Sequence, residues 1–191
     1  MLSCRIVAVL LILFPVSVLA QRPACEWCPV LDTPKVLNWE ISIADASEPG
    51  ERIEISGVIK NADGVTPAAN TIVYLYHTNA KGVYPHRSSD SRSSHAYWHG
   101  YLRGWLKTNE RGEYRFRTIK PASYPNSNIP AHIHCVVKPE NDSIGYYVDD
   151  FLFHGDPFIE SSQDGSASTH IVKLTQASGG LLVGRRDLKL R

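Results

Sequence analysis

Residues 52–59 read Arg-Ile-Glu-Ile-Ser-Gly-Val-Ile, and polar and apolar side chains alternate along most of this stretch. A period of two is typical of a β-strand with one buried face, because successive side chains point to opposite sides of a sheet. Residues 61–64, Asn-Ala-Asp-Gly, follow after Lys60 and have the composition of a tight turn. A strand that ends in a turn is therefore the first element that the sequence predicts.

The rest of the chain repeats this arrangement of short strands and turns, and no long stretch has the 3.6-residue period of a helix. Several short strands separated by turns favour an all-β fold, a β-sandwich with short loops and little helix. Further strands are expected at 70–77, 114–119, 132–137, 146–153 and 168–174.

Composition excludes several classes of protein. The 191 residues allow one domain or at most a small pair, and 43% hydrophobic with 20% charged residues exclude wholesale disorder. The formal net charge of +1 leaves no excess for binding nucleic acid or an anionic membrane. We therefore expect a single globular domain that does not bind its partners through net charge.

The first twenty residues have the pattern of a secretory signal peptide. Arg5 precedes an apolar run over 6–19, and the run ends in Val18-Leu19-Ala20, with small residues where a signal peptidase cuts. A membrane anchor is the alternative, but the run is short for a bilayer and Pro15 interrupts it. The sequence predicts cleavage after Ala20 and a secreted protein, extracellular or periplasmic, with no membrane attachment afterwards.

Export places the remaining cysteines, Cys25, Cys28 and Cys135, in an oxidising compartment. Cys25 and Cys28 form a CxxC pair, for which a local disulfide is favoured over a free pair or a zinc-binding pair. Cys135 is expected to be buried and to pack against other side chains inside the fold. The predicted divisions are a signal peptide at 1–20, an N-terminal segment with the CxxC pair at 21–45, and the β-sandwich at 46–191.

Residues 131–137, Ala-His-Ile-His-Cys-Val-Val, place two histidines two positions apart. On a strand His132 and His134 share one face, so one metal ion can be reached by both. The alternative is that the two histidines belong to a polar face of the sheet and bind no metal. A cupin-type metal site is excluded because Lys138 and Pro139 stand where its glutamate is required.

Four segments, in order, resemble the catalytic domain of the intradiol ring-cleavage dioxygenases, the family of protocatechuate 3,4-dioxygenase and catechol 1,2-dioxygenase. The resemblance covers about residues 50–160. The segments are Asn-Ala-Lys-Gly-Val-Tyr at 79–84, Thr-Ile-Lys-Pro-Ala-Ser-Tyr-Pro at 118–125, Ala-His-Ile-His at 131–134 and Phe-His-Gly-Asp-Pro at 153–157.

The resemblance implies the family's β-sandwich and a non-haem Fe(III) held by Tyr84, Tyr124, His132 and His134. Phenolate oxygens are hard donors suited to ferric iron, and a nearby trivalent cation favours the phenolate form. In the family the tyrosine that corresponds to Tyr124 leaves the metal and acts as general base. A small aromatic diol and O2 are then the expected substrates, and a muconate-type dicarboxylic acid is the product.

Two positions depart from the family pattern and are expected to line the substrate site. Ile129 stands where the family usually has an arginine, and Asp150 stands where it has a glutamine. These changes leave the iron ligands intact but are expected to alter the choice of catechol.

Four other histidines are not expected to bind the metal. His77 stands where the family has a glutamine and is expected to form hydrogen bonds within the fold. His86, His95 and His99 cluster in a serine-rich loop, where exposed positions are favoured over the alternative that they rim the site. Two rivals to an enzyme remain open. One is a secreted sandwich that binds iron or an aromatic ligand without turnover, and the other is an interaction domain with a vacant site. The sequence leaves the oligomeric state undetermined.

Overall fold

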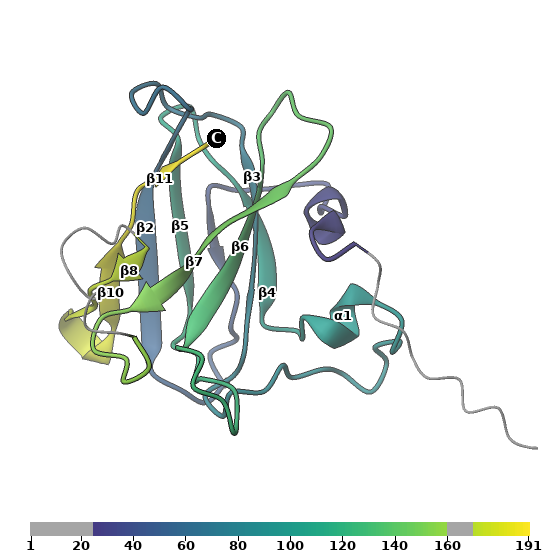
Figure 1. Ribbon diagram of the computed structural model, residues 1–191, viewed down its shortest axis with the longest axis vertical. Coiled ribbons are helices and arrows are strands. Elements are labelled where there is room, and N and C mark those ends of the chain that lie inside the picture. The colour runs from purple at the N-terminus through teal and green to yellow at the C-terminus, as the bar shows by residue number, and fades with distance from the viewer. Residues whose placement is uncertain (1–24, 160–169) are drawn as a thin grey trace, which may run out of the picture.

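The computed structural model describes residues 25–159 and 170–191. In these residues the chain forms two β-sheets packed face to face, with one four-residue α-helix and two short 3-10 helices (Figure 1). The prediction of an all-β sandwich with little helix is confirmed. The predicted signal peptide at 1–20, and residues 21–24 of the predicted N-terminal segment, lie outside the described residues.

The first sheet has the strand order β1-β5-β2-β10-β9, with β11 also paired to β2, and the second has the order β4-β3-β6-β7-β8. The bounds are β1 Glu40–Ser42, β2 Arg52–Lys60, β3 Ile72–His77, β4 Arg103–Lys107, β5 Glu113–Ile119, β6 His132–Lys138, β7 Tyr146–Phe153, β8 Ile171–Val172, β9 Thr175–Gln176, β10 Leu182–Arg185 and β11 Leu188–Lys189. The helices are η1 Cys28–Leu31, α1 His95–Trp98 and η2 Ser178–Gly180.

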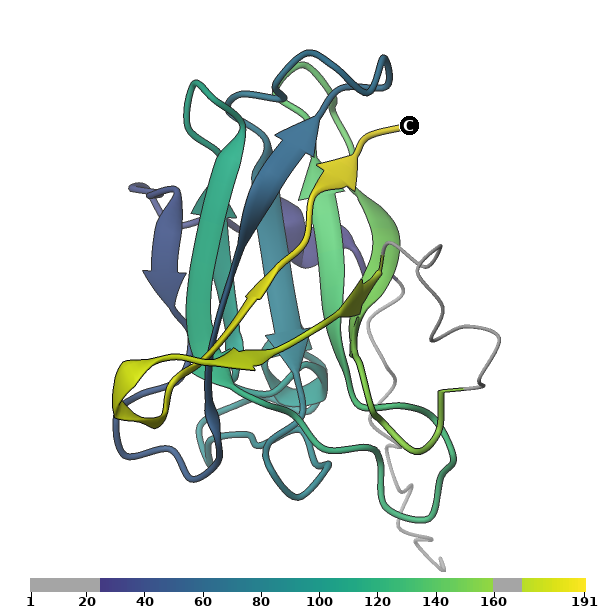
Figure 2. The same ribbon diagram turned by 90° about the vertical axis from the view of Figure 1, so that its left-hand side faces the viewer.

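Strand β2 lies in the middle of the first sheet and alternates as its sequence predicts. Ile53, Ile55 and Ile59 are fully buried, while the residues between them are partly exposed, apart from Gly57. A Cβ at Gly57 would lie 1.7 Å from the carbonyl oxygen of Arg186, so this position must be glycine where the connection between β10 and β11 crosses. Figure 2 shows the C-terminal strands, in yellow, running alongside β2 to the C-terminus.

The hydrophobic core lies between the two sheets and takes alternate residues from the strands of both. Aromatic rings pack edge to face at its centre, with the ring centroids of Phe116 and Phe151 5.5 Å apart. Cys135 is fully buried there, as predicted. The largest contributors are Ile53, Ile55, Leu75, Leu106, Tyr114, Phe116, Phe151 and Phe153.

The second sheet is covered on its outer face as well. On β3, Val73 and Leu75 point into the core, whereas Tyr74 and Tyr76 are buried on the opposite side with Val30 of η1. Figure 1 shows η1 and α1 on this outer side of the sheet, beside β3 and β4. Strand β3 is therefore buried on both faces, and a local layer of short helices encloses space above it.

Five predicted strands are confirmed with small shifts of their ends: β2, β3, β5, β6 and β7. The strand predicted over 168–174 was too long, because in its described part only Ile171–Val172 pairs with β7. The chain then moves to the other sheet, where β9 pairs with β10. Strand β1 pairs with β5, so the sheet begins at Glu40, inside the predicted N-terminal segment 21–45.

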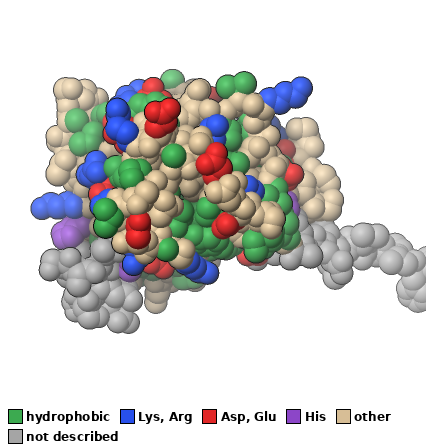
Figure 3. All heavy atoms as spheres, turned by 90° about the horizontal axis from the view of Figure 1, so that it is seen from above, with side chains coloured by type: hydrophobic (Ala, Val, Ile, Leu, Met, Phe, Trp, Pro, Cys, Tyr) green, Lys and Arg blue, Asp and Glu red, His purple; other side chains and the backbone are tan. Residues whose placement is uncertain are grey.

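In the described parts of the chain there is no helix of the length and apolar character needed to cross a membrane. Seen from above, basic and acidic side chains are interspersed at that end of the sandwich (Figure 3). Mixed signs at this spacing give no broad single-signed field on that face.

Candidate metal centre

The two histidines of β6 project from the outer face of the second sheet, since Ile133 between them points into the core. The Nε2 atoms of His132 and His134 lie 3.2 Å apart. The predicted pairing of two imidazoles on one face of a strand is therefore present, and both rings turn the same nitrogen toward one point.

Each imidazole is oriented by a hydrogen bond on its other nitrogen. His132 Nδ1 donates to the carbonyl oxygen of Pro130 at 2.6 Å, and His134 Nδ1 lies 3.0 Å from Asp150 Oδ1. A carbonyl or carboxylate oxygen accepts only, so Nδ1 carries the hydrogen and a neutral ring presents its lone pair at Nε2. Burial lowers the pKa of His132, which favours that neutral form.

An irregularity in the sheet aims Asp150 at His134. The pairing of β6 with β7 shifts register between Ile133 and Cys135, so that both Asp149 and Asp150 lie opposite His134. An extra residue of this kind bends a strand and re-aims its side chains. Asp150 is predicted to line the substrate site. In the structure its side chain is 31% exposed and forms a hydrogen bond to the candidate ligand His134.

Tyr84 follows a turn that begins at Asn79. The backbone N–H groups of Lys81 and Val83 donate to Asn79 Oδ1 at 2.9 and 3.1 Å. Gly82 in this turn has a φ of +75°, and a Cβ there would lie 1.9 Å from the carbonyl oxygen of Ser123. Glycine is thus required both for the turn and for the close approach of the neighbouring loop, which carries Tyr124.

The two tyrosine loops are also joined by hydrogen bonds. Thr78 Oγ1 donates to the carbonyl oxygen of Ala122 at 2.7 Å, and Ala122 N–H donates to the carbonyl oxygen of Asn79 at 3.2 Å. The Tyr84 and Tyr124 hydroxyl oxygens consequently lie 2.6 Å apart, although forty positions separate them in the sequence.

All four predicted ligand residues come together. Tyr124 Oη lies 3.2 Å from His132 Nε2 and 3.4 Å from His134 Nε2. Tyr84 Oη lies 3.0 Å from His134 Nε2. Two phenol oxygens and two imidazole nitrogens thus surround one point.

The donor set fits a ferric ion. Burial raises the pKa of Tyr84 well above its ordinary value, with the Tyr124 hydroxyl adding to the rise, so the phenol ionises only beside a strong cation. Two phenolates and two imidazole lone pairs at these distances repel one another unless a cation lies between them. Hard oxygen donors with imidazole suit Fe(III) better than a soft thiophilic ion.

His132, His134 and Asp150 also offer ligand atoms within 4.8 Å of one another. The Asp150 carboxylate faces His134 Nδ1, whereas His134 Nε2 points at the two tyrosines. The geometry favours the tyrosine set, with Asp150 holding the His134 ring in place.

A cavity of about 200 Å³ opens beside three of the four residues, Tyr84, Tyr124 and His134. Tyr76 forms part of its wall, stacked between His99 and His134 at centroid distances of 3.9 and 4.5 Å. Cavities for drug-sized ligands measure ~300–1,000 Å³, so this one suits a single small ring. The lining residues are Glu26, Tyr76, Tyr84, His95, Trp98, His99, Tyr124 and His134.

The prediction of an exposed loop was wrong for His99, which is 5% exposed, with its Nδ1 2.9 Å from the Tyr74 hydroxyl. His95 is half-buried and lines the same cavity, whereas His86 is exposed as predicted. The physical reason is helix α1, whose N-cap Ser94 accepts from the Tyr97 N–H and turns the segment back onto the sheet.

His77 lies on the inner face of β3, away from the metal ligands. Its Nδ1 donates to the carbonyl oxygen of Thr78, and its Nε2 accepts from Thr118 Oγ1, both at 2.7 Å. This is the hydrogen bonding within the fold that the sequence predicts. Ile129 is 51% exposed on the loop before β6 and is not among the described residues that line the cavity.

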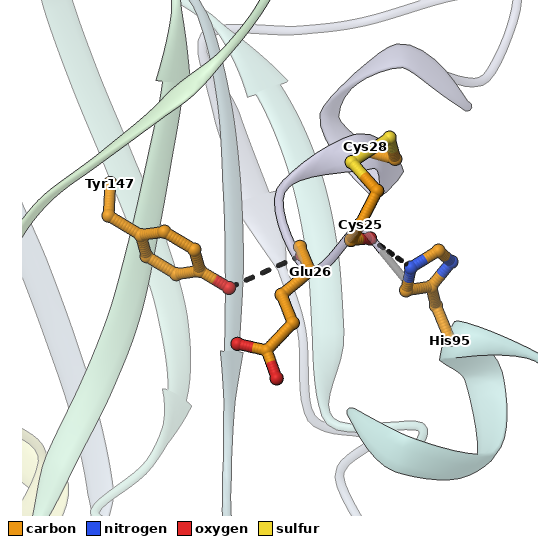
Figure 4. The surroundings of a disulfide bond; sticks show 5 residues. All are labelled: Cys25, Glu26, Cys28, His95 and Tyr147. Atoms are coloured by element: carbon orange, nitrogen blue, oxygen red, sulfur yellow. Dashed lines mark hydrogen bonds between the residues drawn. A yellow bond between two sulfur atoms is a disulfide. The ribbon is translucent and has the colours of Figure 1, made fainter. Parts of the chain in front are cut away.

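Sequence reasoning missed Glu26, Tyr76 and Trp98 as cavity residues. Tyr76 carries a usable signal, because it alternates with Leu75 and His77 and so shares a face with the ligands of the neighbouring strand. Glu26 lies between two cysteines that the structure joins, Cys25 and Cys28, as Figure 4 shows. Nothing local indicates that this segment reaches the cavity.

A family model described as Dioxygenase matches residues 33–180. Catechol 1,2-dioxygenase 1 of Acinetobacter lwoffii is 30% identical over 147 residues, which are 68% of this chain and 45% of that protein. The protocatechuate 3,4-dioxygenase beta chain of Burkholderia cepacia is 34% identical over 116 residues, 58% of this chain and 48% of that protein. The chain thus spans about half the length of these curated relatives.

The structure of catechol 1,2-dioxygenase from Acinetobacter sp. ADP1 superposes with a TM-score of 0.61 and 26% identity, over 79% of this chain and 56% of that chain. The likeness therefore covers most of this chain and about half of that chain.

Proposed function

This chain belongs to the intradiol ring-cleavage dioxygenase family, and we propose that it is an exported enzyme that opens the ring of a small catechol with O2. The observation that carries the proposal is the convergence of Tyr84, Tyr124, His132 and His134 beside a cavity of one-ring size. Export is proposed from the signal-peptide pattern of residues 1–20.

Tyr84, Tyr124, His132 and His134 would hold one non-haem Fe(III). Bound ferric iron supplies the redox chemistry through which a catechol reacts with O2, both oxygen atoms entering a muconate-type dicarboxylic acid. The protein's own contribution is to position the diol, take up its protons and keep the ligands aligned.

Tyr124 is suited to take a proton from the substrate. Its hydroxyl oxygen is within 3.4 Å of the donor atoms of all three other ligand residues. It lies on the loop between β5 and β6, which no strand pairing holds, whereas the histidines are fixed in β6. As a phenolate, Tyr124 would have the basicity to accept a catechol proton at Oη, so ligand and general base would be one residue.

The remaining ligands are held more rigidly. Asp150 and the Pro130 carbonyl fix the two imidazoles, and such partners raise ligand basicity as well as orient the ring. Tyr76 and His99 form an aromatic wall that limits water beside the ligands and offers a flat surface to the substrate ring.

Two measurements on the secreted protein test this function. Metal analysis should find about one iron per chain, and an oxygen electrode should record O2 uptake with catechol, protocatechuate or hydroxyquinol. The His132→Ala variant is the matched control and should lose both signals. Iron without O2 uptake on the whole panel would instead identify a non-catalytic iron-binding or aromatic-binding sandwich, and a protein without metal would identify an interaction domain.

A further inference from the structure

The segment 25–31, here called the disulfide arm, is fixed onto the outer face of the second sheet. The Cys25–Cys28 bond closes its first turn. Val30 at its end is fully buried against Tyr74, Tyr76 and Val136. Three carbonyl oxygens of the arm accept hydrogen bonds from side chains of the sandwich: Cys25 from His95, Glu26 from Tyr147 and Pro29 from Trp105.

This attachment places Glu26 at the substrate site. Glu26 lines the 200 Å³ cavity that holds both tyrosine ligands, and it also lines a neighbouring cavity of about 400 Å³. Both cavities include Tyr76 and His134, so Glu26 stands where the two meet. Figure 4 shows its carboxylate directed away from the disulfide, between Tyr147 and His95 in that view.

Apart from the metal ion proposed above and the histidines, the charged side chains that line the two cavities are all acidic. Of the described residues that line them, the charged ones are Glu26, Asp149 and Asp150, and none is lysine or arginine. A carboxylate only accepts hydrogen bonds, so such a wall accommodates a donor or a cation and repels an acidic substituent.

We propose that Glu26, held in place by the disulfide arm, determines substrate choice by favouring catechols with a cationic side chain over catechols with a carboxylate. This inference rests on the proposed function, because it assumes that the diol is held beside the four ligand residues. The larger cavity receives the ring substituent, and selectivity comes from repulsion of the wrong substrate as much as from attraction of the right one.

Binding measured without turnover tests the inference. The iron-loaded protein is titrated under argon in a calorimeter with 3,4-dihydroxyphenethylamine and with 3,4-dihydroxybenzoate, and the ratio of the two dissociation constants is recorded. We expect the wild type to bind the amine more tightly. Glu26→Gln should lower that preference by about tenfold, the order expected for one nearby charge on an exposed side chain.

Two variants serve as controls. Glu26→Asp keeps the carboxylate and should retain most of the preference. Glu110→Gln removes a carboxylate from the exposed turn before β5, at the far end of that strand from the Tyr124 loop, and should leave the ratio unchanged. The inference is overturned if the wild type prefers the benzoate or binds neither probe, or if Glu26→Gln has the wild-type ratio.

The arm itself is tested with the double variant Cys25→Ser/Cys28→Ser, in which the preference should fall toward that of Glu26→Gln. A wild-type preference in this variant would show that the disulfide does not hold Glu26. Oxygen uptake is recorded separately on every protein. Loss of uptake with retained amine preference would contradict the dioxygenase function but not the role of Glu26.

Discussion

The two faces of strands β3 and β6 have different roles, although their residues alternate along the same strands. The inner face carries Val73, Leu75, Ile133 and Cys135, which pack between the sheets. The outer face carries aromatic and imidazole side chains, and these are buried too, but beneath a thin layer made of the disulfide arm and α1. A shift of one position along a strand separates a residue that stabilises the fold from one that forms the site.

This arrangement separates stability from chemistry in a testable way. The apolar inner-face residues pack within the core between the sheets, so their truncation should lower the free energy of unfolding and leave the ligands in place. Outer-face ligands have polar partners and contribute less to the core, so their loss should remove the metal while the fold persists.

The largest effect is expected at the outer-face histidines. His132→Ala or His134→Ala removes a ligand itself, so iron affinity should fall by more than the ~10–100-fold that loss of a hydrogen-bond partner behind a ligand costs. Iron per chain, measured by mass spectrometry of the metal, should drop toward zero while circular dichroism still reports a folded β protein. A variant that keeps full iron would break the assignment of that histidine.

The tyrosines should separate metal binding from proton transfer. Two tyrosinates on ferric iron give a broad visible charge-transfer band, so the loaded protein should be reddish, and Tyr84→Phe or Tyr124→Phe should shift or bleach the band. Only Tyr124→Phe also removes the proposed base, which is worth ~10²–10⁴ in rate. Equal losses of kcat per bound iron in the two variants, in an oxygen-electrode assay, would contradict that division.

The inner face should show the opposite behaviour. Ile133→Ala truncates a fully buried side chain between the two ligands, and a change of this kind costs ~2–5 kcal/mol of unfolding free energy. Urea denaturation measures the loss. At low denaturant the variant should still bind iron and show the visible band. A fold left at full stability but without iron would show that the two faces are not independent.

How far the sequence predicts this protein differs between the two faces. The alternation in 52–59 and the paired histidines at 132 and 134 determine which residues point inward and which outward, because strand geometry is local. The layer over the outer face could not be predicted. The positions of Glu26 and His99 depend on the docking of the disulfide arm and α1 onto the sheet, which are contacts between segments far apart in sequence.

The sequence also does not predict the short strands β1 and β11, for a related reason. Strand β1 has three residues and β11 has two, too few for a period to be visible, and both exist because they pair with central strands. The Cys25–Cys28 pairing, by contrast, depends on a spacing of three residues and was accessible from the sequence.

The inner face also predicts a pH dependence of stability. Burial lowers the pKa of His77 to about 4, well below its value in an unfolded chain. Below the unfolded pKa of ~6.5 the unfolded chain binds a proton that the folded chain does not. The free energy of unfolding therefore decreases as the pH is lowered from ~6.5 to ~4. From pH 7 to pH 5 the loss should be about 2 kcal/mol by urea denaturation.

The comparison variant is His77→Gln, which keeps a polar side chain but does not titrate. Between pH 7 and pH 5 the variant should lose less unfolding free energy than the wild type, and the difference should equal the amount assigned to His77. An identical pH slope in the two proteins would place the titrating group elsewhere.

The smallest effect on the metal site is expected from the disulfide that closes the arm. If Cys25 and Cys28 are oxidised, the intact mature chain should be two hydrogens lighter than the reduced chain. Cys135 should then be the single alkylable thiol, and only after unfolding, because burial raises its pKa to about 12. Three alkylable thiols in the unreduced protein would refute the pairing.

The energetic consequence follows from the size of the loop. A disulfide stabilises mainly by restricting the unfolded chain, and a loop of this length is worth only about 2 kcal/mol on the chain-entropy scale. Cys28→Ser should therefore lower the melting temperature by a few degrees and leave iron content and the visible band in place, because none of the four ligand residues lies on the arm. Loss of iron in this variant would mean that the arm supports the metal ligands as well as the cavity wall. The outer face would then resemble the inner one, a layer whose integrity the whole site requires.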